Sequence, residues 1–83
     1  MEHTEPYRTR DSSFAAYLLT LGYEPHTQEH DGVVWFHFEL PDARDIKDKY
    51  FSGITISAIE YSNNMKRVKQ LIFDSRQNNR RTV

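Results

Sequence analysis

The stretch from Gly32 to Leu40 most constrains how this chain can fold. Its even-numbered positions are all apolar: Val34, Phe36, Phe38 and Leu40. Successive side chains of a β-strand point to opposite faces of a sheet, so this alternation predicts a strand with one wholly apolar face. Pro41 ends the strand because it has no N–H to donate. We therefore expect this strand to form the floor of the hydrophobic core.

Local signals before this strand predict a helix and a hairpin. The helix is capped by Asp11 or Ser12 and ends before Gly22, which suits a left-handed residue after a helix. Its apolar residues recur with helical spacing, and they are Phe14, Tyr17, Leu18 and Leu21. A polar strand over residues 23–29 follows. Asp31-Gly32 is a strong signal for a tight turn that joins this strand to the apolar one.

Capping residues after the apolar strand predict two more helices. The first starts at Asp42 and ends at Gly53. The second starts with the capping box Ser57-Ala58-Ile59-Glu60 and runs to about Asp74. Its apolar stripe is Tyr61, Met65, Val68, Leu71 and Ile72.

These elements predict a small single α+β domain in the order (β)-α-β-β-α-α, with a β-hairpin packed against helices. The bracketed strand is Tyr7-Arg8-Thr9, whose alternation suits a short edge strand. The domain covers residues 7–75. Residues 1–6 are expected to be a loose lead-in, and residues 76–83 a flexible basic tail, because neither segment offers an apolar pattern.

Composition favours a cytoplasmic protein. The chain of 83 residues has no cysteine, so neither disulfides nor thiolate zinc sites can stabilise it. Residues 1–6 lack the basic and apolar segments of a signal peptide. No apolar run approaches the roughly 20 residues that a membrane-spanning helix needs. We therefore expect no contact with a membrane.

Five stretches between residue 7 and about residue 75 carry a resemblance to a known family. They are Tyr7-Arg8-Thr9-Arg10-Asp11, Phe14-Ala15-Ala16-Tyr17-Leu18-Leu19-Thr20-Leu21-Gly22-Tyr23, Val33–Glu39, Asp48-Lys49-Tyr50-Phe51-Ser52-Gly53 and Lys66-Arg67-Val68-Lys69-Gln70-Leu71-Ile72-Phe73. On these residues the chain resembles a family of small proteins of unknown function found in phages, prophages and other mobile elements. The resemblance implies an origin in a mobile element and supports the fold. The family has no assigned activity to carry over.

No pattern for catalysis, a cofactor or a metal stands out. There is no Gly-x-Ser-x-Gly motif, and the three glycines are scattered at predicted turns and helix ends. His26, His30 and His37 lie on the predicted hairpin, but positions 26 and 30 of a strand are about 13 Å apart. His26 and His37 can face each other and supply two ligands at most. We expect a solvated or pH-sensitive histidine face, and no enzyme, cofactor or metal site.

Trp35 lies on the face of the strand opposite the apolar one, with Val33 and His37. A large amphipathic ring on a wet face is often a contact residue. These three residues are therefore candidates for binding a partner or for self-association as a two-fold dimer. The other interpretation is that Tyr7, Tyr23 or a longer helix covers the ring.

Charge is unevenly distributed along the chain. Residues 1–56 carry five Lys or Arg against ten Asp or Glu, whereas residues 57–83 carry six against two. The basic residues of this second part are Lys66, Arg67, Lys69, Arg76, Arg80 and Arg81. Such a segment either contacts phosphates or forms a solvated helix face.

The expected function is a non-catalytic binding module of a phage or mobile element. Its preferred partner is nucleic acid, bound through the basic C-terminal helix and tail. The alternative is a protein–protein inhibitor or adaptor, such as an anti-defence protein that blocks a host component. That protein would use the acidic body and the Trp35 face of the hairpin.

Overall fold

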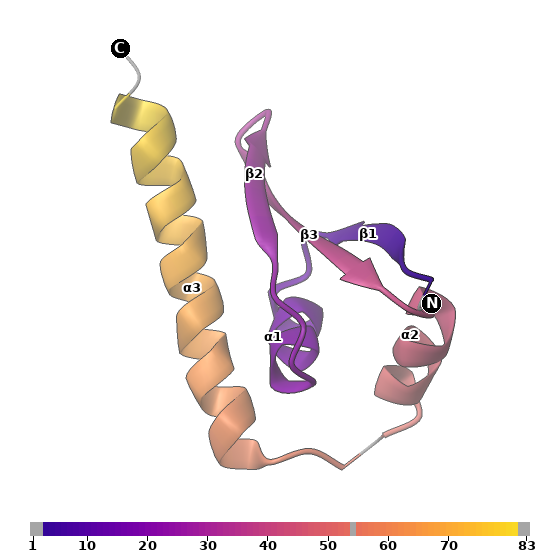
Figure 1. The fold of residues 1–83 in the computed structure, drawn as a ribbon. Coiled ribbons are helices and arrows are strands. Elements are labelled where there is room, and N and C mark those ends of the chain that lie inside the picture. The colour runs from indigo at the N-terminus through magenta and orange to yellow at the C-terminus, as the bar shows by residue number, and fades with distance from the viewer. Residues whose placement is uncertain (1–2, 54, 82–83) are drawn as a thin grey trace.

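The structure, a computed structural model, describes residues 3–53 and 55–81, with side chains up to residue 77 (Figure 1). It is a small compact α+β domain in the expected order β-α-β-β-α-α. Its elements are β1 (Glu5–Thr9), α1 (Ser12–Thr20), β2 (His26–His30), β3 (Val33–Leu40), α2 (Ala43–Phe51) and α3 (Ala58–Arg81).

The strands form one antiparallel sheet in the order β1-β3-β2, so the apolar strand β3 is central. The third strand, β1, extends the predicted hairpin by pairing Tyr7 with Phe38 and Thr9 with Phe36. It begins at Glu5, so residues 5 and 6 belong to the sheet and not to the expected lead-in. Pro6 is tolerated because β1 lies at an edge.

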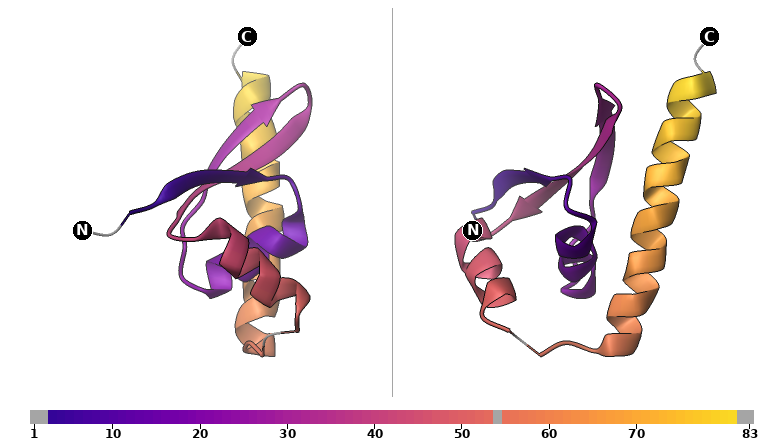
Figure 2. Two further views of the ribbon diagram at one scale, coloured as in Figure 1. Left: turned by 90° about the vertical axis from the view of Figure 1, so that its right-hand side faces the viewer. Right: turned by 180° about the vertical axis from the view of Figure 1, so that it is seen from behind.

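One face of the sheet and helix α1 form most of the core, to which α2 adds Ala43 and Ile46 and α3 adds Val68. The even-numbered side chains of β3 are all buried, as predicted. Helix α1 lies beneath the sheet between α2 and α3 (Figures 1 and 2). It is therefore buried from Phe14 through Leu19, on more sides than the predicted single stripe. Leu21, which that stripe included, is 40% exposed because it follows the last helical turn.

The predicted turn and caps are present. Asp31 and Gly32 at the hairpin have φ of 52° and 81°. The Asp11 carboxylate accepts hydrogen bonds from the backbone N–H groups of Ser13 and Phe14, at 3.0 and 3.2 Å. Asp42 caps α2 through the N–H of residue 45, at 3.0 Å. The Ser57 hydroxyl caps α3 through the N–H of residue 60, at 3.2 Å.

Helix α3 is longer than predicted. It continues past Asp74 to Arg81, so residues 76–81 are helical and not a flexible tail. The extension has a local cause: residues 58–81 contain neither glycine nor proline, and the Gln70 amide donates to the Asp74 carboxylate at 2.9 Å. Among the described helices, none has the length and apolar character needed to cross a bilayer.

An aromatic cluster joins α2 to α1. The Tyr50 ring lies 5.1 Å from that of Phe14 and 4.9 Å from that of Tyr17, measured between centroids. Tyr7 of β1 meets Phe14 edge-on at 5.8 Å. Burial, together with the neighbouring Tyr61 and Asp11, raises the pKa of the Tyr50 hydroxyl. Rings at these separations stabilise the contact between the elements that carry them.

Candidate functional site: the open face of the sheet

The sheet face turned away from the helices is the main candidate surface. We call it the open face, and its residues are Arg8, Arg10, His26, Gln28, His30, Val33, Trp35, His37 and Glu39. Each of these side chains is half-buried or exposed. The strand register places Arg8 and His26 on either side of His37. The face therefore combines cationic, aromatic and imidazole groups on three adjacent strands.

Two arginines cover the ring of Trp35. The guanidinium carbon of Arg8 lies 4.6 Å from the Trp35 ring centroid, and that of Arg10 lies 5.9 Å away. Both separations fall within the range of cation–π attraction. Trp35 thus lies on the face opposite the core, as expected, and is half-buried. Tyr7, which the other interpretation offered as a cover for this ring, points to the other face and packs on Phe14.

Two of the three histidines of the hairpin face each other, and the third lies apart from them. His26 and His37 face each other across β2 and β3, with ring centroids 6.4 Å apart, as predicted. His30 lies at the turn, where its Nε2 is 3.3 Å from a carboxylate oxygen of Asp31. No group of three or more His, Cys, Asp or Glu residues in the described part of the chain is placed to hold a metal ion.

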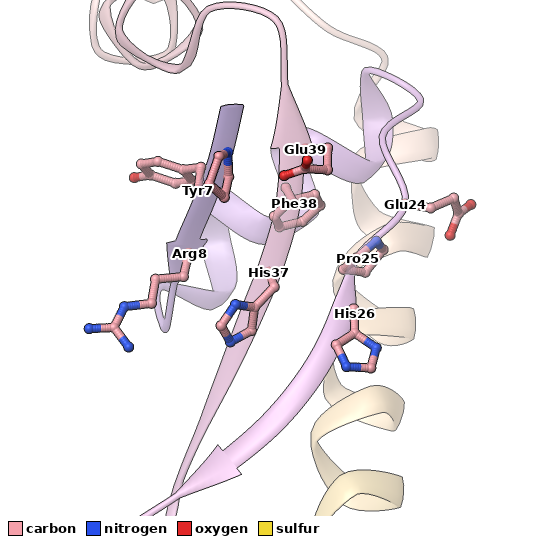
Figure 3. Close-up of a pocket in the computed structure, with 9 residues that line it drawn as sticks. Tyr7, Arg8, Glu24, Pro25, His26, His37, Phe38 and Glu39 are labelled. Carbon is pink, nitrogen blue, oxygen red and sulfur yellow. The ribbon is translucent and has the colours of Figure 1, made fainter. Parts of the chain in front are cut away.

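A hollow of about 640 Å³ lies at one end of the open face, between β1 and the start of β2 (Figure 3). Its lining includes Arg8, His26, His37 and Glu39. Glu24 also borders the hollow, but its carboxylate points outward (Figure 3). A smaller hollow of about 130 Å³ shares Arg8 and His37 and continues past Trp35. The two hollows therefore adjoin at Arg8 and His37.

The predicted basic residues of α3 differ in their surroundings. Lys66, Lys69 and Arg76 are exposed and have no ion pair to any residue that the structure describes. They lie on the same side of the helix as Phe73, which is 57% exposed. The side chains of Arg80 and Arg81 lie outside the described residues.

Arg67 differs from the other cations of α3. Its guanidinium donates two hydrogen bonds to the Glu24 carboxylate, of 2.6 and 3.3 Å. These bonds lower the pKa of the Glu24 carboxyl and raise the pKa of Arg67. A guanidinium held in this way has fewer donors left for a phosphate. Arg67 is therefore a weaker candidate contact than sequence reasoning suggested.

Sequence reasoning had assigned Trp35, Val33 and His37 to the site but missed Arg8 and Arg10. Alternation in Tyr7-Arg8-Thr9 separates Arg8 from Tyr7, and Arg10 has the same parity as Arg8. That signal places both arginines on one face of an edge strand. It does not show that this strand pairs with β3, which is what brings them to Trp35. Comparisons of the chain with models of protein families, with curated proteins and with solved structures found no match.

Proposed function

We propose that this protein is a cytoplasmic, non-catalytic module that binds single-stranded nucleic acid on the open face of its sheet. The observation that carries the proposal is the cation–π contact of Arg8 with Trp35, with the guanidinium carbon 4.6 Å from the ring centroid, on a face that none of the described helices covers. A mobile-element origin, implied by the family resemblance, is compatible with such a role.

Arg8 is available for contact with phosphate. Its guanidinium carbon lies 4.6 Å from the centroid of the Trp35 ring, and the guanidinium N–H groups have no hydrogen bond or ion pair to any residue that the structure describes. Arg10 adds a second positive charge within 5.9 Å of the same ring. Because packing on Trp35 already restricts the Arg8 side chain, less entropy is lost when a phosphate binds. The pair therefore favours anionic partners.

Single strands suit this surface better than duplexes. Ring side chains at Trp35 and His37 lie on one face of β3, about 6.8 Å apart along the strand. Unpaired bases can stack on such rings and on guanidinium planes, whereas the bases of a duplex are stacked on each other. The excess of acidic residues over positions 1–56 opposes the approach of a highly charged duplex.

Helix α3 offers a second cationic surface, formed by Lys66, Lys69 and Arg76 beside the exposed Phe73. Helix α3 lies on the core side of the sheet, where its Val68 is fully buried, and the open face lies on the other side (Figures 1 and 2). We expect the helix to contribute less, since none of its described cations makes a cation–π contact with an aromatic ring.

The test uses Trp35 itself, because it is the only tryptophan of the sequence and lies at the centre of the open face. Titration with a mixed-sequence single-stranded oligonucleotide at low salt should change its fluorescence. The double variant Arg8→Ala/Arg10→Ala should bind more weakly and flatten the slope of log K against log salt by about 0.7 for each lost phosphate contact. The triple variant Lys66→Ala/Lys69→Ala/Arg76→Ala removes three charges from α3, one more than the double variant, and is the control for the loss of positive charge alone. It should have the smaller effect.

Two outcomes contradict the proposal. If the triple variant loses affinity and the double variant does not, the helix is the binding surface, as sequence reasoning first suggested. If neither single- nor double-stranded oligonucleotides bind at low salt, the protein does not bind nucleic acid. The inhibitor or adaptor function then becomes the leading hypothesis, because Trp and Arg are also the residues most enriched in protein–protein hot spots.

A further inference from the structure

The hollow of about 640 Å³ at one end of the open face is lined by side chains of both charges, which the open-face proposal alone does not explain (Figure 3). Arg8 supplies a positive charge at one side, and Glu39 supplies a negative charge two residues along the facing strand. A site for phosphates alone would gain nothing from the carboxylate. The ligand of this hollow should therefore carry both an anionic group and hydrogen-bond donors.

Glu39 is the carboxylate that is available to such a ligand. It is exposed, and it has no hydrogen bond or ion pair to the residues that the structure describes. Glu24, the other acid at the hollow, points outward and is held by Arg67 at 2.6 Å (Figure 3). Glu39 belongs to β3, two residues after His37, and its side chain lines the hollow (Figure 3).

A carboxylate has two acceptor oxygens and no donor, so it pairs best with two adjacent N–H groups. Among the nucleobases, guanine presents such a pair on its Watson–Crick edge, at N1 and at the exocyclic N2. Adenine and cytosine place an acceptor nitrogen beside their amino group. Uracil and thymine place carbonyl oxygens on both sides of their single N–H. The carboxylate therefore distinguishes guanine from the other bases.

Resting on the proposed function, we propose that this hollow is a subsite for one unpaired guanine nucleotide. Glu39 accepts hydrogen bonds from N1–H and N2–H of the base, and Arg8 donates to the adjoining phosphate. The rings of Pro6 and Pro25, which also line the hollow, offer apolar surface to the flat base. The volume lies within the range of about 300–1,000 Å³ that is usual for small-ligand sites.

The experiment compares heptamers with three thymidines on either side of a central guanosine, inosine, adenosine, cytidine or thymidine. Each is titrated against the protein at one low salt concentration and followed by Trp35 fluorescence. The guanosine heptamer should bind about tenfold more tightly than the thymidine heptamer. Inosine lacks the N2 amino group and should fall between them.

The variant Glu39→Gln should remove this preference, because an amide offers one acceptor and one donor in place of two acceptors. Because it also removes a negative charge from the open face, it should raise the affinity for the all-thymidine heptamer slightly, so the readout is the ratio of the guanosine affinity to the thymidine affinity. Glu5→Gln makes the same charge change on an exposed residue outside the hollow and is the matched control. It should keep the guanine preference.

The outcomes separate the two proposals. Equal affinity for all five heptamers overturns the guanine subsite and leaves the open-face function intact. A guanine preference that survives in Glu39→Gln overturns the role of Glu39. Absence of binding to every heptamer overturns the proposed function, and the subsite with it.

Discussion

Arg67 and Glu24 are bound side by side, with Nη2–Oε2 and Nη1–Oε1 distances of 2.6 and 3.3 Å. This pair ties the middle of α3 to the segment that leads into β2. The same segment, residues 24–26, forms one wall of the hollow on the open face. The pair therefore connects α3, the binding surface predicted from the sequence, to the wall of the hollow on the open face, the binding surface that we propose.

The Arg67–Glu24 pair predicts a pH dependence. Hydrogen bonds from Arg67 lower the pKa of the Glu24 carboxyl from its ordinary value of 4.5. A lowered folded-state pKa means that the pair stabilises the fold fully above that ordinary value, and that its contribution is lost as the pH falls through the lowered pKa. In Arg67→Ala, the pKa of Glu24 should return toward 4.5. NMR titration of the side-chain carboxyl carbon measures it.

The effect of this pair on stability should be small, because both side chains are exposed and water screens their attraction. Lys47→Ala, which removes a cation without an ion pair to any described residue, serves as the control. An unchanged Glu24 pKa in Arg67→Ala would show that the two side chains do not interact in solution.

Removing one central ring should nearly unfold the domain. Phe36 is fully buried, and its replacement by alanine leaves a cavity that costs about 3–5 kcal/mol of the free energy of unfolding. Phe38→Ala should behave similarly, since that ring is only 2% exposed. Phe73→Ala, on the exposed side of α3, should change the free energy of unfolding by less than about 0.5 kcal/mol. Urea unfolding measures all three. Equal stability of the three variants would mean that the assigned faces of β3 are wrong.

The hairpin turn requires a left-handed residue at position 32. Gly32 has a φ of 81°, and a Cβ added there meets no atom within 4 Å. Gly32→Val should therefore destabilise the protein through backbone strain alone, by about 1–2 kcal/mol. Gly32→Asn should cost less, because asparagine tolerates this conformation. Thermal unfolding of both variants checks the order, and a valine variant as stable as wild type would contradict it.

Self-association through the Trp35 face stays a prediction. The sequence suggested a dimer because a two-stranded hairpin would be incomplete, whereas β1 supplies a third strand and brings Arg8 and Arg10 over the ring. Light scattering with size-exclusion chromatography checks the prediction. If the face mediates dimerisation, wild type should be dimeric and Trp35→Ser monomeric. A monomeric wild type at high concentration excludes the dimer.

Local patterns predicted much of the fold. The faces of β3, the caps at Asp11, Asp42 and Ser57, and the turn at Gly32 each depend on residues close together in the chain. Such signals are strong because side-chain alternation and capping act over a few residues. The order of elements followed from them.

The candidate site was harder to predict because its contacts join distant parts of the chain. Arg8 reaches Trp35 only because β1 pairs with β3, and a pattern of three residues does not specify that register. The bond from Arg67 to Glu24 spans 43 positions. The end of α3 was misplaced for a different reason: polar residues after Asp74 suggested a tail, although nothing there interrupts a helix.

The attachment of α2 has a consequence for how the domain opens. Its contacts with the core come chiefly from Ala43, Ile46 and Tyr50, and a hollow of about 320 Å³ separates part of it from the end of α1. Few buried contacts mean a low free energy of local opening. Amide protons of α2 should therefore exchange with deuterium well before those of β3, so the domain should loosen at one end while the sheet and its open face remain intact.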